Sequence, residues 1–261
     1  MHLPALLVAS AIAILGLMAV GWLLSLALRD ASVVDTLWGL GFALVAGVAL
    51  AVGPGLFARR LLVLALVGAW GLRLSSHILR RNWGKGEDFR YREFREWWGK
   101  RFWWVSLFTV FLLQGVLMFV VSLPIQVAGA GEVPVRLGVL EAVGALVWAV
   151  GLAFEAIGDL QLSRFTADPA SKGKVMDRGL WRYTRHPNYF GDSLVWWGIG
   201  LVALTAPWGW AALAGPALMT FLLVRVSGVA MLEKTIAQRR PGYEGYVHRT
   251  SAFVPLPPRK A

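Results

Sequence analysis

The sequence predicts an all-α membrane protein with about seven transmembrane helices, and two observations carry this prediction. Of the 261 residues, 57% are hydrophobic and the mean hydropathy is +0.60, which is typical of polytopic membrane proteins. The apolar residues also form runs of roughly 20 residues, the length that a helix needs to cross the hydrocarbon core. Such uninterrupted runs are helical, because lipid offers no partners to unpaired backbone groups.

Seven apolar runs are candidate spans, and the sixth is the shortest. They are Leu3–Leu28, Val33–Val52, Leu56–Leu79, Phe102–Val121, Leu137–Ile157, Tyr189–Leu204 and Trp208–Ala230. The first run resembles a signal peptide in position, but no Lys or Arg precedes it and it is longer than a usual h-region. We therefore expect it to be a retained helix.

The net charge of +11 is concentrated in two connecting segments and the C-terminal tail. These carry Arg80, Arg81, Lys85, Arg90, Arg92, Arg95, Lys100 and Arg101, then Arg164, Lys172, Lys174, Arg178, Arg182 and Arg185, and finally Lys234, Arg239, Arg240, Arg249, Arg259 and Lys260. With seven spans all three lie on one face, which the positive-inside rule makes cytoplasmic, so the N-terminus lies outside and the C-terminus inside. Arg59 and Arg60 are exceptions at the outer end of the third span. Because this rule already accounts for the charge, we expect no nucleic-acid partner.

The chain has no cysteine and four scattered histidines, so we expect no disulfide, no thiolate catalysis and no metal site. We expect one domain over residues 1–261, with its motifs in the part from about 150 to 255. The Asn82–Lys100 segment suits a helix on the cytoplasmic surface, with Trp97 and Trp98 among the lipid headgroups. The Ser122–Arg136 segment contains Pro and Gly at several positions and is expected to be an outer loop.

The most informative stretch runs from Gly179 to Asp192 and reads GLWRYTRHPNYFGD. Polar and charged groups beside membrane spans are costly and usually serve a function. Pro187 suits the first turn of a helix, whose positive N-terminal end favours an anion beside the cations before it. We therefore predict a phosphate-bearing cofactor here. The alternative is a simple positive-inside anchor, which would explain the cations but not the neutral and acidic groups beside them. The polar members are Arg182, Tyr183, Arg185, His186, Asn188, Tyr189 and Asp192.

Three further acidic sites are candidates. Glu155 and Asp159 are four residues apart, so they share one helical face, where they can accept hydrogen bonds from a ribose or an amide; the alternative is a structural ion pair with Arg164 or Arg185. Asp35, near the start of the second span, either donates a proton from a dry chamber or serves as an interfacial acid near Arg29. Glu233 and Lys234 end the helix that contains the seventh span. Glu233 is either a solvated helix terminus or, because it opposes the helix dipole, a partner of Arg225 or of a ligand.

The Gly179–Asp192 stretch is followed by Glu233-Lys234 and by a segment from Arg239 to Pro255 that reads RRPGYEGYVHRTSAFVP. Together these motifs resemble the C-terminal domain of bacterial steroid 5α-reductase-like proteins. The resemblance covers about the last hundred residues, from Glu155 to Pro255. The wider superfamily includes sterol reductases and isoprenylcysteine or phospholipid methyltransferases. Two departures concern Glu233, near whose place animal steroid reductases carry a tyrosine, and the first half of the chain, which matches only loosely.

The resemblance implies NADPH as the cofactor and reduction of a carbon–carbon double bond conjugated to a ketone, as in a 3-oxo-Δ4 steroid. Asn188, Tyr189 and Asp192 would line the nicotinamide side of the site, and Tyr189, Glu233 or Asp35 would supply the acid that meets charge on the ketone oxygen. The remaining residues expected around the cofactor are Glu155, Asp159, Arg164, Lys174, Arg182, Tyr183, Arg185, His186, Arg225, Tyr246 and Arg249.

The expected protein is thus an integral membrane enzyme, in a bacterial inner membrane, with its cofactor site on the cytoplasmic side. A steroid or other lipid-like substrate would enter from the bilayer. One alternative is an S-adenosylmethionine-dependent methyltransferase, because the Arg-His-Pro-x-Tyr element also occurs in that branch. Another is a non-catalytic lipid-binding protein, which would instead show charge and broken helices at mid-membrane. The sequence leaves the oligomeric state open.

Overall fold

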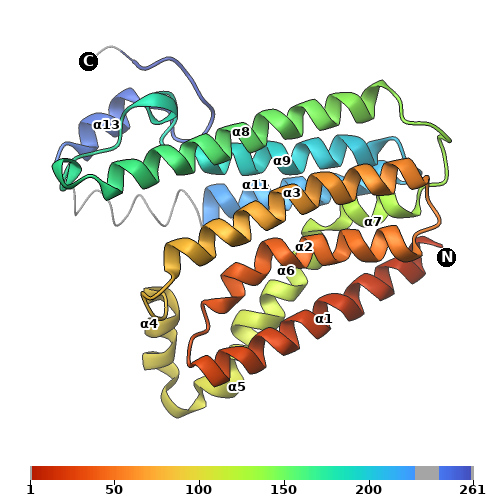
Figure 1. Ribbon diagram of the computed structural model, residues 1–261, viewed down its shortest axis with the longest axis horizontal. Coiled ribbons are helices and arrows are strands. Elements are labelled where there is room, and N and C mark those ends of the chain that lie inside the picture. The colour runs from red at the N-terminus through yellow and green to blue at the C-terminus, as the bar shows by residue number, and fades with distance from the viewer. Residues whose placement is uncertain (1, 227–240, 260–261) are drawn as a thin grey trace. The chain divides into compact units, whose positions relative to one another are not determined.

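A computed structural model describes residues 2–226 and 241–259, and within these ranges every regular element is helical (Figure 1). The described residues contain six helical segments long and apolar enough to cross a membrane. These are α1 (Leu3–Leu28), α2 (Val33–Val52), α3 (Phe57–Asn82), the segment Phe89–Val121, α8 (Val139–Ala167) and the segment Gly209–Val226. The all-α membrane class is confirmed. The predicted sixth span forms α9 (Pro187–Leu204) but is not among the six, so the count of seven and the orientation stay predictions.

Two of these segments contain short irregular pieces. Phe89–Val121 comprises α4 (Phe89–Trp98), a 3-10 turn (Gly99–Arg101), α5 (Phe102–Ser106), a π-helical stretch (Leu107–Leu112) and α6 (Leu113–Val121). Gly209–Val226 comprises α10 (Gly209–Ala212), α11 (Ala214–Phe221) and a π-helical stretch (Leu222–Val226). Of the segment Asn82–Lys100, for which a helix was expected, residues Phe89–Trp98 form α4, and the place of this helix on the cytoplasmic surface stays a prediction.

The chain forms two compact units, each built from two parts of the sequence. The first contains Met1–Ala142 and Ile199–Gly215, and the second contains Val143–Gly198 and Pro216–Ala261. The expectation of a single domain over residues 1–261 stays a prediction.

In the first unit, two glycines allow α2 and α3 to pack in direct backbone contact. A Cβ atom at Gly39 would lie 2.4 Å from the carbonyl oxygen of Gly71, and a Cβ at Gly71 would lie 2.4 Å from that of Gly39. Next to this crossing, Ser75 donates a 2.7 Å hydrogen bond to the Thr36 carbonyl. The aromatic rings of Phe42 and Trp70 are both fully buried beside each other, and a well-packed aromatic pair adds to the stabilisation from buried area alone.

The expected outer loop over Ser122–Arg136 is wrong in its first half, because residues Leu123–Ala130 form a short helix, α7. Pro124 lies in the first turn, where its missing N–H removes no hydrogen bond and its fixed φ suits a helix. Ile125, Val127 and Ala128 are buried, so this helix belongs to the core of the first unit. Pro and Gly in this stretch begin and end the helix instead of marking a continuous loop.

Arg59, one of the two cations that departed from the positive-inside pattern, is fully buried and neutralised. Its Nη2 atom lies 3.2 Å from Oε1 of Glu141, and its Nη1 donates a 3.0 Å hydrogen bond to the Gly131 carbonyl. Thr205 donates to the same Glu141 oxygen at 2.7 Å, and the Gly138 N–H donates to the other at 2.9 Å. The ion pair therefore joins several segments of the first unit.

In the second unit, α8 and α9 pack closely along a line of small residues. A Cβ at Gly191 would lie 2.4 Å from the Glu155 nitrogen and 2.5 Å from the Gly151 carbonyl, and one at Gly198 would lie 2.6 Å from the Gly144 carbonyl. Gly144, Gly151 and Gly158 are seven residues apart, as are Gly191 and Gly198, so these small residues recur on one face of each helix. This contact fixes the start of α9 against α8.

Candidate functional site

The informative stretch begins with a turn fastened to α8. Gly179 has a φ of +58°, and a Cβ there would lie 2.4 Å from Nε2 of Gln161, so only glycine fits. Gln161 in turn accepts a 3.0 Å hydrogen bond from the Leu180 N–H. The buried indole of Trp181 donates to the Gly158 carbonyl at 3.0 Å. Residues Gly179–Arg182 form a 3-10 turn on this support.

The C-terminal segment wraps around the same stretch. Arg185 is buried, and its Nη1 donates to the carbonyls of Val247 at 3.0 Å and Thr250 at 2.9 Å, close to the end of α13 (Tyr243–Arg249). Thr184 and Ser251 form an isolated parallel bridge, in which the Arg185 N–H donates to the Ser251 carbonyl at 2.8 Å. Tyr246 donates its hydroxyl to the Trp181 carbonyl. Arg185 thus positions α13 relative to the turn.

This arrangement creates a cavity of about 580 Å³ lined by four arginine side chains. Its lining residues are Asp177, Arg178, Gly179, Arg182, Tyr246, Arg249, Thr250, Pro258 and Arg259. A second cavity of about 530 Å³ shares Asp177, Arg178, Tyr246 and Arg249 with the first, and Lys174 is among its other lining residues. The four arginines are exposed, so their guanidinium groups are available to a ligand. A wall with four cations and one carboxylate suits a ligand that carries several negative charges.

Polar side chains also gather where α9 begins against α8. The amide of Asn188 donates to the Asp159 carboxylate at 3.1 Å, and both Asp159 and Glu155 are buried on α8. The ring of buried His186 stacks on that of Tyr189, with centroids 5.5 Å apart and planes 9° apart. Asp192 is buried one turn after Asn188. The predicted sharing of a helix face by Glu155 and Asp159 agrees with this placement.

Most predicted cofactor residues lie outside the walls of both cavities. Among them are the residues gathered where α9 begins against α8, namely Glu155, Asp159, Asn188, Tyr189 and Asp192. Arg164 and Arg225 are exposed, as is Tyr183, whose carbonyl accepts a 3.0 Å hydrogen bond from the Leu256 N–H. Arg185 and His186 are buried in the packing described above. Glu233 lies outside the described residues. The roles of these residues toward a cofactor stay predictions, whereas Lys174, Arg182, Tyr246 and Arg249 do line the cavities.

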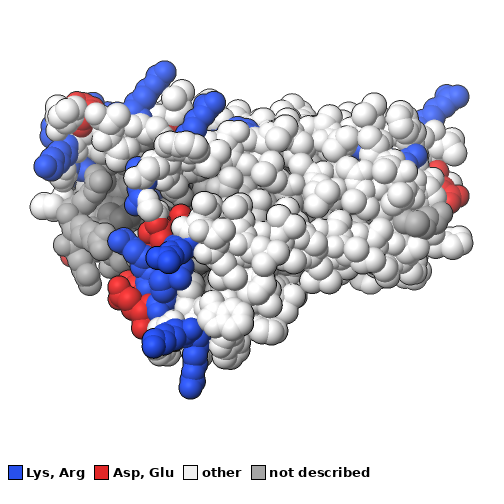
Figure 2. All heavy atoms as spheres, turned by 60° about the horizontal axis from the view of Figure 1, so that its bottom comes forward, with Lys and Arg blue, Asp and Glu red and all other residues white. Residues whose placement is uncertain are grey.

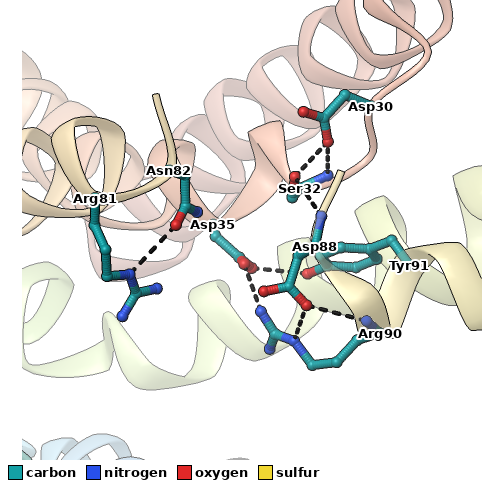
Figure 3. A network of polar contacts seen from close by, with 8 residues as sticks. All are labelled: Asp30, Ser32, Asp35, Arg81, Asn82, Asp88, Arg90 and Tyr91. Atoms are coloured by element: carbon teal, nitrogen blue, oxygen red, sulfur yellow. Dashed lines mark hydrogen bonds and ion pairs between the residues drawn. The ribbon is translucent and has the colours of Figure 1, made fainter. Parts of the chain in front are cut away.

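Asp35, the third acid candidate, lies in a polar network of the first unit (Figure 3). Its Oδ2 accepts a 2.7 Å hydrogen bond from Arg90 Nη2, and its Oδ1 accepts one of 2.7 Å from the Tyr91 hydroxyl. Arg90 also donates from Nε to Asp88 at 2.9 Å. Asp35 therefore joins α2 to α4 as an acceptor, and its cationic partner is Arg90 and not Arg29, which the interfacial alternative named. The proton-donor role of Asp35 stays a prediction.

The loop before α4 carries two carboxylates with perturbed acidity. Burial alone raises the pKa of Glu87, but two hydrogen bonds of 2.8 Å from Arg95 and one from the Ala31 N–H outweigh it, so this pKa lies below its ordinary value. The pKa of Asp88 is likewise lowered, because the hydrogen bonds and charge of Arg90 outweigh the effect of burial. Both carboxylates are therefore ionised at neutral pH.

Sequence reasoning missed Asp177, Arg178, Thr250, Pro258 and Arg259 as lining residues. Arg178 stands directly before the motif, and Arg259 had been counted only as part of the tail's charge. The position of Arg178 beside the motif could have indicated it. Arg259 reaches the cavity only because the tail folds back, and the Arg259 N–H donates to the Arg249 carbonyl at 2.9 Å. Among the described residues no group of His, Cys, Asp and Glu could hold a metal ion.

Comparisons with known proteins give one family and two relatives. The model of the family described as "Protein of unknown function (DUF1295)" matches residues 21–250. The probable O-methyltransferase ustE of Ustilaginoidea virens is 31% identical over 96 residues, which cover 33% of this chain and 34% of that protein. The uncharacterized protein C594.04c of Schizosaccharomyces pombe is 24% identical over 264 residues, which cover 90% of this chain and 75% of that protein. The match to the methyltransferase thus spans about a third of its length. No solved structure matches.

Proposed function

The chain belongs to the family described as "Protein of unknown function (DUF1295)", and we propose that it is a membrane-embedded reductase that uses NADPH. Its substrate is a lipid-like enone, such as a 3-oxo-Δ4 steroid, whose carbon–carbon double bond is reduced. The resemblance of the Gly179–Asp192 stretch to steroid 5α-reductase-like proteins supports the reaction class. The arginine-lined cavity supports the cofactor, and this is the observation on which the proposal depends.

The cavity wall fits the charge of NADPH. This cofactor carries a pyrophosphate and a 2′-phosphate, and each phosphate oxygen can accept charge-assisted hydrogen bonds from a guanidinium fork. Arg178 and Arg249 line both cavities, while Arg182 and Arg259 line only the larger one. We assign these four side chains to the phosphates. The shared lining residues would let one extended ligand occupy both cavities.

The start of α9 would then hold the nicotinamide end. Asn188 is fixed by Asp159, and Tyr189 by its stacking on His186, so both side chains are preorganised for hydrogen bonding to a ligand. When bound, NADPH supplies the hydride; the protein's contribution is to orient the ring, exclude water and place an acid near the ketone oxygen. Tyr189, Asp35 and Glu233 remain the candidates for that acid.

A second candidate is an S-adenosylmethionine-dependent methyltransferase, which the similarity to the probable O-methyltransferase of Ustilaginoidea virens favours. The charge of the cavity argues for the reductase instead. S-Adenosylmethionine carries a sulfonium, an ammonium and one carboxylate but no phosphate. Its net charge is positive, so four neighbouring guanidinium groups suit it less well than they suit NADPH.

Calorimetric titration of the purified protein with NADPH and with S-adenosylmethionine separates the two candidates. We expect NADPH to bind, and we expect Arg178→Gln and Arg249→Gln each to weaken it about 10- to 100-fold, because a hydrogen bond to a charged group contributes about 1.5–3 kcal/mol. Arg136→Gln, at an exposed position outside both cavities and not among the expected cofactor residues, controls for the loss of one charge. Binding of S-adenosylmethionine alone would overturn the proposal in favour of the methyltransferase.

A turnover assay tests the reaction itself. We expect NADPH oxidation to depend on a 3-oxo-Δ4 steroid or a related enone, and the double variant Asn188→Ala and Asp192→Ala to abolish it. The variant's circular dichroism and thermal unfolding should show that it still folds. Unchanged turnover in this folded variant would remove both residues from the site.

A further inference from the structure

Helix α4 and the residues on either side of it carry both cations and large exposed aromatic side chains. Residues 80–101 contain eight Lys or Arg and four Asp or Glu. Trp83 and Trp97 are 76% and 78% exposed, and Phe89 and Trp103 are each more than half exposed. In Figure 2, charged side chains gather at this end of the first unit, while its membrane helices present an uncharged surface. Tryptophan and phenylalanine so exposed are unfavourable in water but well placed among lipid headgroups.

The five cations of α4 and the 3-10 turn after it divide into two groups. Arg90 and Arg95 are paired with Asp35, Asp88 and Glu87, and they fasten α4 to the start of α2. Arg92, Lys100 and Arg101 are exposed, and the described residues give none of them an ion pair. The acids near the α2 junction are thus already paired with Arg90 and Arg95. The outward cations share the exposed surface of α4 with two acids, Glu93 and Glu96.

This second group lies on the same short segment as the exposed aromatic rings. Arg92 precedes Trp97 by five residues, and Lys100 and Arg101 directly precede the run Phe102-Trp103-Trp104. The ring of buried Phe102 lies 4.4 Å beneath the Arg95 guanidinium, which fixes the junction of α4 with the following helix. A rigid segment whose rings insert at headgroup depth holds its cations at the level of the lipid phosphates.

We propose that Arg92, Lys100 and Arg101, together with the exposed aromatic side chains around them, form a binding surface for the headgroups of anionic phospholipids. The ligand is a lipid of the surrounding leaflet and is separate from the cofactor and from the substrate. Its negative charge complements the unpaired cations, and its glycerol and upper acyl region contacts Trp97 and Trp103. The surface concentrates anionic lipid around the first unit, whatever reaction the second unit supports.

The absence of cysteine allows a direct test with a single fluorophore. Glu96, exposed on α4, is replaced by cysteine and labelled with the dye NBD, and the protein is placed in phosphatidylcholine nanodiscs. Nanodiscs then contain about 10 mol% of a doxyl-labelled quencher lipid, either phosphatidylglycerol or phosphatidylcholine. We expect the anionic quencher to act at about fivefold higher local concentration, because one Lys or Arg near an anionic surface contributes about 1 kcal/mol.

Two variants locate the effect in this labelled protein. In the triple variant Arg92→Gln, Lys100→Gln and Arg101→Gln, the two quencher lipids should reduce the NBD fluorescence equally. The control Arg136→Gln, Arg164→Gln and Lys172→Gln removes the same charge from exposed positions elsewhere and should keep the fivefold preference. Equal quenching in the parent protein would overturn the proposal. So would a preference retained by the triple variant, or one lost equally in the control, since each would assign the effect to charge elsewhere.

Discussion

At the scale of single residues, burial decides which charges serve the fold and which face a ligand. Arg59 and Arg185 are buried and donate to a carboxylate or to backbone carbonyls. Arg182 and Arg249 are exposed and line the cavity. From the sequence, all four are cations near the ends of spans. It does not show which two are buried, because the acceptors of Arg59 and Arg185 are distant along the chain.

The Arg59–Glu141 pair provides a residue-scale test. We expect Glu141→Ala to destabilise the protein by about 3–5 kcal/mol, since removing one partner leaves a buried guanidinium without its counter-charge. Thermal unfolding in detergent measures the change. The exposed acid Glu132 offers the control Glu132→Ala, which should shift the midpoint little. A small effect of Glu141→Ala would show that Arg59 finds other acceptors.

At the scale of elements, glycine spacing sets the packing of α8 on α9. We expect Gly191→Ala to destabilise the second unit by about 1–3 kcal/mol, because its Cβ would overlap the α8 backbone. Gly68→Ala is the matched control, since a Cβ there meets nothing within 4 Å, and alanine favours a helix. Thermal unfolding of both variants checks this. Equal midpoints would contradict the close contact.

The attachment of α4 should weaken in acid. Because the pKa values of Glu87 and Asp88 are lowered, the stabilisation that these carboxylates give to the attachment of α4 is complete above their ordinary pKa values of 4.5 and 3.8. It is lost as the pH falls through the lowered pKa, because the unfolded state then binds protons first. Hydrogen exchange of α4 amides at about pH 6 and about pH 3, corrected for intrinsic rates, measures this loss. If the α4 amides stayed as protected relative to those of α8 at about pH 3 as at about pH 6, Glu87 and Asp88 would not hold α4 in place.

Element prediction from the sequence worked where a single pattern dominates. The first two spans were predicted with the bounds that α1 and α2 have. In lipid a long apolar run forms a helix, because only then are its backbone groups hydrogen-bonded within the segment. The prediction for α7 was wrong, because Pro124 and Gly129 indicate a turn in local terms. Their roles at the start and near the end of a buried helix follow from tertiary packing.

At the scale of the whole molecule, the sequence indicated the ingredients of the candidate site but not its assembly. The motif gave Arg182, and the tail gave Tyr246 and Arg249. Their meeting around one cavity depends on Arg185, Thr184 and Gln161, which hold the turn and the tail together. Such positioning roles leave no pattern in a single sequence, which is why the wall residue Arg259 was missed, whereas Arg178 directly precedes the motif.

The central claim is that the arginine-lined cavity binds the phosphates of NADPH. A crystal structure of the protein grown with NADPH tests it most directly. The account predicts the 2′-phosphate or pyrophosphate within hydrogen-bond distance of Arg178 and Arg249, with the nicotinamide directed to the start of α9. A cofactor bound elsewhere, with those two guanidinium groups left in solvent, would contradict it.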